Sequence, residues 1–86
     1  MEGSKAYIKI PRDRIGALVG PDGSVKAVIE RKLSVDLDVD SEAGAIQITL
    51  PATAEDPTVL FRAKEVVTAI GRGFAPDHAF RLLDDD

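Results

Sequence analysis

The sequence contains no cysteine and a single histidine, His78. The absence of cysteine excludes a disulfide scaffold, a thiolate nucleophile and a thiolate metal site, and one imidazole cannot form a multi-histidine metal site by itself. No apolar run approaches the ~20 residues of a membrane-spanning helix, and the first residues lack the hydrophobic stretch of a secretory signal. We therefore expect a cytoplasmic protein that is not an enzyme, binds no metal or cofactor and does not associate with membranes.

The net charge of the 86 residues is −4, but it is distributed unevenly. Residues 1–32 contain seven basic and four acidic side chains, whereas residues 33–86 contain four basic and eleven acidic ones. An acidic molecule repels nucleic acid at long range, although a local basic surface in the first part of the chain can still attract it. A chain of this length suffices for one compact domain, so we expect a single domain over residues 1–86.

The hydrophobic periodicity predicts three strands and four helices. The expected strands span residues 6–10, 35–40 and 46–50, and the expected helices span 15–19, 24–33, 57–70 and 76–83. Each pattern has one apolar side that must be buried. The sequence therefore predicts an α+β fold of order β-α-α-β-β-α, in which three helices cover one face of a three-stranded antiparallel sheet, with a short C-terminal helix added.

Residues with capping preferences mark the ends of these helices. Ser24 is expected to cap the second helix, and Asp56 is expected to cap the third, with Pro57 at its first helical position. Gly71 and Gly73 end the third helix. Three aspartates at 84–86 oppose the helix dipole, so we expect the last turn to fray.

The segment Gly20-Pro21-Asp22-Gly23 joins the first two helices by a Gly-x-x-Gly turn. Two glycines allow a tight reversal and leave no Cβ between the backbone and a ligand. The turn is also expected to present unpaired amides at the start of a helix, where the dipole favours an anion such as phosphate. Such turns also connect helices for steric reasons alone.

Residues 15–29, with the Gly20–Gly23 loop and apolar pairs on both sides, resemble the core of a KH domain. The resemblance implies a type I KH fold with its core at about residues 5–73 and a C-terminal extension at 74–86. It also implies binding of single-stranded RNA, because a KH loop clamps the backbone of about four nucleotides while the bases lie in an apolar groove. The candidate RNA-binding residues are Arg12, Arg14, Ile15, Gly16, Val19, Gly20, Pro21, Asp22, Gly23, Ser24, Lys26, Ile29, Leu37 and Val39.

Later segments resemble a narrower family. These are Val39-Asp40-Ser41-Glu42, the run from Ala69 to Phe74, and Pro76 with Ala79-Phe80 and Leu82-Leu83. They are similar to the first KH domain of the archaeal partner-of-Nob (Krr-like) proteins, a family that carries two KH domains and assists the maturation of small-subunit ribosomal RNA. The resemblance implies a non-catalytic adaptor that binds rRNA and works with a ribosome-assembly nuclease or another assembly factor.

The charged residues near the loop allow two interpretations. Arg12, Arg14, Lys26 and Arg31 either line a phosphate track or form an ordinary solvated helix face. Asp22 places a negative charge where KH loops are usually basic or neutral, and a carboxylate beside a phosphate costs on the order of 1 kcal/mol in water. Lys26 can offset that charge. The alternative function is therefore a KH fold that serves as a protein-docking module and does not contact RNA.

Three other groups have plain structural interpretations. The aspartates at 36, 38 and 40 have calcium-like spacing, but alternation places them on one solvent-facing side of a strand, without the loop that an EF-hand needs. Ser24 and His78 are interpreted as a helix cap and a surface residue rather than a hydrolytic pair. Phe61, Phe74 and Phe80 are interpreted as core or docking residues rather than platforms for base stacking.

Overall fold

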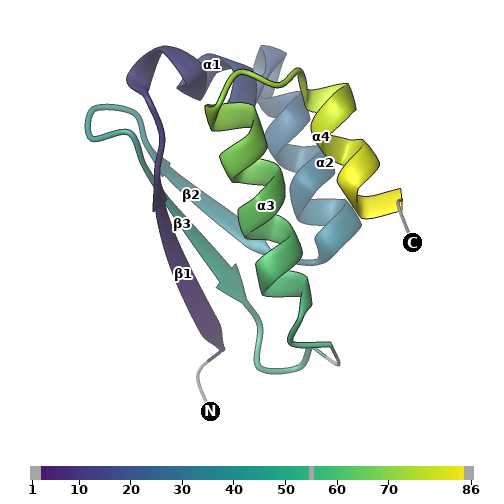
Figure 1. Ribbon diagram of the computed structural model, residues 1–86. Helices are drawn as coiled ribbons and strands as arrows, with labels where there is room; N and C mark the ends of the chain where they lie inside the picture. The colour runs from purple at the N-terminus through teal and green to yellow at the C-terminus, as the bar shows by residue number, and fades with distance from the viewer. Residues whose placement is uncertain (1–2, 55, 85–86) are drawn as a thin grey trace.

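The structure is a computed structural model that describes residues 3–54 and 56–84, with side chains as far as residue 81 (Figure 1). A three-stranded antiparallel sheet is covered on one face by helices, and the C-terminal helix packs against α3. This arrangement confirms the predicted fold class and element order. The elements are β1 (Ser4–Lys9), the 3₁₀ helix η1 (Arg12–Arg14), α1 (Ile15–Val19), the 3₁₀ helix η2 (Pro21–Gly23), α2 (Ser24–Leu33), β2 (Asp36–Asp40), β3 (Ala45–Leu50), α3 (Val59–Gly71) and α4 (Pro76–Asp84).

The strands lie in the order β1-β3-β2, so β1 and β2 are both edge strands. The register places Ile48 between Ala6 and Leu37 on the helix-covered face, where Ile48 and Leu37 are buried. On the other face, the same register places Gln47 between Tyr7 and Asp38. Strict alternation of apolar and polar residues produces these two faces because successive side chains of a strand point in opposite directions.

The core lies between the sheet and the helices, and α3 supplies the largest share of it. Fully buried side chains of α3 are those of Ala63, Val66, Val67 and Ile70. The end of α3 approaches the end of β1 so closely that a Cβ at Gly71 would lie 2.5 Å from Cγ2 of Ile10. Glycine at this position therefore sets the distance between helix and sheet.

The start of α3 differs from the prediction. Helix α3 begins at Val59, its N-cap is Thr58, and no side chain caps it. The Asp56 carboxylate instead accepts hydrogen bonds from the Thr58 amide, at 2.9 Å, and from the Thr58 hydroxyl. The predicted Asp56 cap with Pro57 in the helix is therefore wrong, because Asp56 closes a local turn two residues ahead instead.

The hydrogen bond from the Thr58 hydroxyl, followed by that from the Thr58 amide, lowers the pKa of the exposed Asp56 carboxyl. A carboxyl with a lowered pKa in the folded state stabilises the fold above its ordinary pKa. That contribution disappears as the pH falls through the lowered value, so this turn loosens only under acidic conditions.

Helix α4 covers the range predicted for the C-terminal helix, from Pro76 to Asp84. The expected fraying concerns residues 84–86, of which 85 and 86 lie outside the described residues. Over residues 3–54 and 56–84, no helix has both the length and the apolar character needed to cross a membrane.

Candidate nucleic-acid interface

The loop from Gly20 to Gly23 reverses the chain through left-handed backbone conformations. Gly20, Asp22 and Gly23 have φ values of 76°, 53° and 76°. A Cβ at Gly20 would lie 2.8 Å from the amide nitrogen of Val25, whereas a Cβ at Gly23 would meet nothing within 4 Å. Gly20 is therefore required by packing as well as by its conformation, whereas Gly23 faces open space that a ligand can enter.

Most amides of the loop already have acceptors. The Gly20 amide donates to the Gly16 carbonyl at 2.8 Å, and the Gly23 amide donates to the Gly20 carbonyl at 3.1 Å. Pro21 has no N–H, so within the loop only the amide of Asp22 has no acceptor among the described residues. The prediction of unpaired loop amides is thus limited to Asp22, because the end of α1 provides the acceptor for the Gly20 amide and the turn η2 provides that for the Gly23 amide.

Ser24 is the first residue of α2, and its amide donates to the Pro21 carbonyl. The N-cap position belongs to Gly23, and no side chain makes a capping hydrogen bond there. The predicted Ser24 cap is therefore wrong, because η2 runs into α2 without the extended residue that a serine cap needs. The Ser24 side chain is exposed instead.

The apolar candidates for RNA binding differ in how much of each side chain is exposed. Ile15, Ile29 and Leu37 are only 7%, 0% and 2% exposed, and they belong to the hydrophobic core. Val19 and Val39 are half-buried and pack against that core from the surface. The structure thus places the first three beneath the surface, and only the two valines present apolar area that a base can touch.

Glu30 links α2 to the edge of β2. Its Oε2 accepts the Leu37 amide at 3.0 Å and lies 3.4 Å from Nζ of Lys26. Lys26 thus forms an ion pair with Glu30 one helical turn ahead. Its charge is therefore not directed toward Asp22, as the sequence had suggested. Sequence reasoning missed Glu30, although its spacing of four residues from Lys26 is the usual signal of an intrahelical ion pair.

Arg14 binds the C-terminal end of α3. Its Nε donates to the Ile70 carbonyl at 2.8 Å and its Nη2 donates to the Phe74 carbonyl at 3.2 Å. A cation is favoured there by the helix dipole, and the Ile70 carbonyl accepts the Arg14 side chain in addition to the Gly73 amide. The guanidinium of Arg14 therefore has a structural role and does not belong to the predicted phosphate track. Arg12 and Arg31 remain exposed.

We expect an Arg14→Ala substitution to lower the free energy of unfolding by about 1–2 kcal/mol, because it removes the charged donor from the Ile70 and Phe74 carbonyls. Urea unfolding followed by circular dichroism measures the change. Arg12→Ala removes the same charge from an exposed position and should change the stability by less than about 0.5 kcal/mol. Equal effects of the two substitutions would refute the structural role.

The remaining sequence candidates are surface residues. Gly16, Pro21 and Asp22 are exposed, and so is His78. The aspartates of β2 are exposed along one face of the strand, and no acidic or histidine cluster that could hold a metal ion occurs in the described part of the chain. Of the phenylalanines, Phe80 packs against the core, whereas Phe61 and Phe74 are exposed.

Comparisons with known proteins agree with this geometry. The sequence model of the Krr1 KH1 domain matches residues 6–85. The KH domain-containing protein MJ0443 of Methanocaldococcus jannaschii is 42% identical over 79 residues, which are 92% of this chain and 34% of that protein. The chain thus spans about a third of this curated relative.

Solved structures are also similar to this chain over nearly its whole length. Dim2p from Pyrococcus horikoshii is 45% identical with a TM-score of 0.89, over 93% of this chain and 48% of that one. A chain of the a/eIF2α–aDim2p–rRNA complex from the same organism matches with the same identity and TM-score, over 93% of this chain and 45% of that one. A protein of unknown function from Aeropyrum pernix is 40% identical with a TM-score of 0.92, over 100% of this chain and 46% of that one. The chain spans about half of each.

Proposed function

Because this chain belongs to the family of Krr1 first KH domains, we propose that its Gly20–Gly23 loop and the half-buried valines Val19 and Val39 bind a short single-stranded segment of ribosomal RNA. The observation that carries the proposal is the open space at Gly23, where the backbone has a φ of 76° and an added Cβ would meet no protein atom within 4 Å. A phosphate can approach the peptide backbone at such a position. The loop and groove of a KH domain reach about four nucleotides.

Several neighbouring features support this role. The Asp22 amide is unpaired among the described residues, and the loop leads directly into α2, whose N-terminal end favours an anion. Val19 and Val39 supply apolar area for bases, and Arg12 supplies an exposed positive charge. The Asp22 carboxylate opposes phosphate binding, so the expected affinity is low.

The relatives support a proposal for the wider role. The aDim2p complex from Pyrococcus horikoshii contains rRNA and the protein a/eIF2α. For this chain we infer a cytoplasmic, non-catalytic adaptor in small-subunit maturation, which holds pre-rRNA near an assembly nuclease or another assembly factor. The second candidate is a KH fold that docks proteins without contacting RNA, and Asp22 and the net charge of −4 favour it.

An NMR titration with six-nucleotide single-stranded RNAs of varied sequence tests the proposal. Amide shifts should concentrate at residues 12–29 and 36–40, and duplex RNA of the same sequence should cause none of them. Saturable shifts confined to other parts of the molecule, or no shifts at millimolar RNA, would leave the protein-docking function as the better explanation.

We expect Asp22→Lys to tighten RNA binding and to steepen its salt dependence by roughly 0.7 in log–log slope, because one added cation releases the counterion of one phosphate. Isothermal titration at several salt concentrations measures both quantities. Asp38→Lys, on the exposed outer face of β2, makes the same change of charge and should leave the slope unchanged. An unaltered slope for Asp22→Lys would place the RNA backbone elsewhere.

A further inference from the structure

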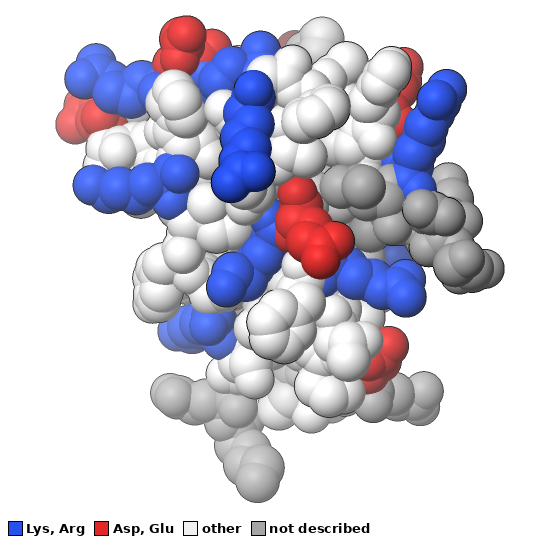
Figure 2. All heavy atoms as spheres, in the orientation of Figure 1, with Lys and Arg blue, Asp and Glu red and all other residues white. Residues whose placement is uncertain are grey.

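Three of the four aromatic side chains of this chain are exposed, one on β1, one on α3 and one in the segment between α3 and α4. Tyr7, Phe61 and Phe74 are 70%, 67% and 55% exposed. Lys and Arg side chains predominate over Asp and Glu on the face that includes α3 and β1 (Figure 2). We call the area formed by Lys5, Tyr7, Lys9, Phe61, Lys64 and Arg72 the β1–α3 surface. Aromatic groups exposed among cations are typical of a surface that binds a partner.

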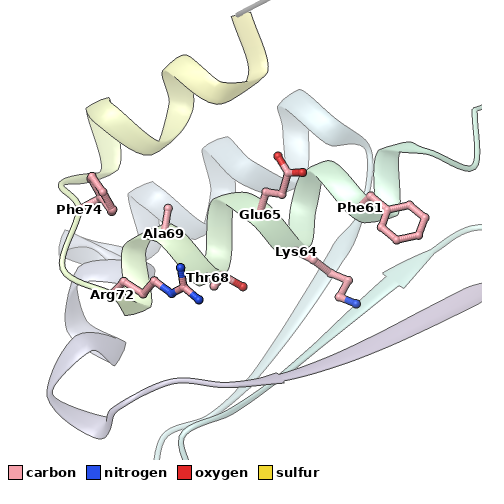
Figure 3. Close-up of a pocket in the computed structure, with 7 residues that line it drawn as sticks. All are labelled: Phe61, Lys64, Glu65, Thr68, Ala69, Arg72 and Phe74. Atoms are coloured by element: carbon pink, nitrogen blue, oxygen red, sulfur yellow. The ribbon is translucent and has the colours of Figure 1, made fainter.

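Two hollows run along this surface. The first lies between β1 and the start of α3, has a volume of about 460 Å³, and is lined by Tyr7, Leu60 and Phe61 among others. The second follows α3 from Phe61 to Phe74, has a volume of about 420 Å³, and is lined by the cations Lys64 and Arg72 and by one carboxylate, Glu65 (Figure 3). Phe61 and Lys64 line both hollows, so the two are adjacent.

The backbone of β1 is open along the same side. The Ile10 amide donates to the Gly44 carbonyl, next to β3. Peptide groups alternate in direction along a strand, so those of Lys5, Tyr7 and Lys9 face away from β3. Within the described residues, no hydrogen bond reaches these groups. A strand edge with free donors and acceptors can accept a further strand.

The opposite edge of the sheet differs. There the Leu37 amide is bound by the Glu30 carboxylate of α2. One edge is thus partly covered by a side chain, whereas the β1 edge lies beside an apolar hollow. The contrast makes β1 the edge suited to strand addition.

The charges on β1 decide which partner fits. In an antiparallel pair of two β1 strands centred on Tyr7, Lys5 of each copy would lie opposite Lys9 of the other, and like charges at opposed positions are destabilising. A second copy is therefore disfavoured. RNA would match the lysines but would leave the row of strand peptide groups without regular partners. An extended acidic peptide satisfies both features.

We propose that the β1–α3 surface docks an extended acidic segment of a partner protein, which adds to β1 as a fourth strand. Its acidic side chains lie on the outer face against Lys5 and Lys9. Its alternate, apolar side chains enter the hollow beside Leu60 and Phe61, with Lys64 at the margin. This interaction does not depend on RNA binding by the Gly20–Gly23 loop.

The test uses a blocked seven-residue peptide of alternating aspartate and valine. In NMR titrations of the whole chain it should shift the amides of Ser4–Lys9 and of residues 57–64. It should also slow hydrogen exchange at the amides of Lys5, Tyr7 and Lys9. A peptide with lysine in place of aspartate should bind at least about tenfold more weakly. A peptide with N-methyl groups on the amides that face β1 should bind little, because it cannot pair with the strand.

Matched variants locate the site. The double substitution Lys5→Glu and Lys9→Glu should weaken peptide binding about tenfold. Arg31→Glu with Lys32→Glu makes the same change of charge at exposed positions of α2 and should have little effect. Equal binding of the N-methylated peptide, RNA-induced shifts centred on the β1–α3 surface, or a dimer that forms through β1 in sedimentation experiments would each overturn the proposal.

Discussion

A Gly23→Asp variant is expected to bind RNA with a Kd at least about thirtyfold higher, while its circular dichroism spectrum remains native. The added carboxylate would stand where a phosphate approaches, and such a repulsion grows from ~1 kcal/mol in water to ~4 kcal/mol near a protein surface. The fold should tolerate the change, because a Cβ at this position meets no atom within 4 Å. Aspartate is also one of the few residues that adopt a left-handed conformation at modest cost.

Two other glycines provide controls for this result. Gly73→Asp adds the same charge at another glycine with positive φ and open surroundings, and it should leave RNA binding unchanged. Gly20→Asp should instead disturb the fold, because a Cβ there would lie 2.5 Å from Cγ2 of Val25. If Gly23→Asp binds RNA as well as the unmodified chain, the loop is only a turn.

Linking this chain to a second KH domain should tighten RNA binding by ~10²–10⁴, because the second contact becomes intramolecular. The isolated chain is expected to bind weakly, with a Kd between about 10 μM and 1 mM. Its contact covers only about four nucleotides, and the net charge of −4 repels RNA at long range.

Isothermal titration of the single chain and of a tandem protein, on one RNA long enough for both sites, measures the gain. An RNA of five nucleotides can occupy only one site at a time, so it should show no avidity gain in the tandem protein. Nanomolar affinity of residues 1–86 alone would contradict the expectation and would require contacts beyond the loop and the adjoining valines.

The sheet was predictable from the sequence because apolar and polar residues alternate along each strand, which decides which side of the strand is buried. Leu37 and Val39 alternate with three aspartates, and a shift of one residue would bury the carboxylates. Gly71 likewise marks the end of α3, where a Cβ would collide with Ile10. These positions combine a local pattern with a large energetic penalty for any alternative.

The errors occurred where several partners compete for one side chain. Asp56 can cap a helix or close a turn, and the choice depends on the neighbouring Thr58 hydroxyl. Arg14 can meet a phosphate or a helix end, and the Ile70 carbonyl is brought to it only by the fold. The exposure of the apolar candidates was not predictable either, because hydrophobic periodicity assigns Ile29 to the apolar side of a helix without indicating how much of its side chain remains exposed.

The hydrogen bond from Arg14 to the Phe74 carbonyl connects the C-terminal segment to the rest of the domain. Ala79 of α4 is 1% exposed and belongs to the same core as the sheet. A cut after residue 73 would remove a hydrogen-bond acceptor and uncover part of α3, so it would not separate two independently folding parts. Residues 74–81 are therefore expected to open and close together with the rest of the domain as one cooperative unit. Evolutionary recombination that transfers this domain intact would therefore have its boundary beyond residue 81.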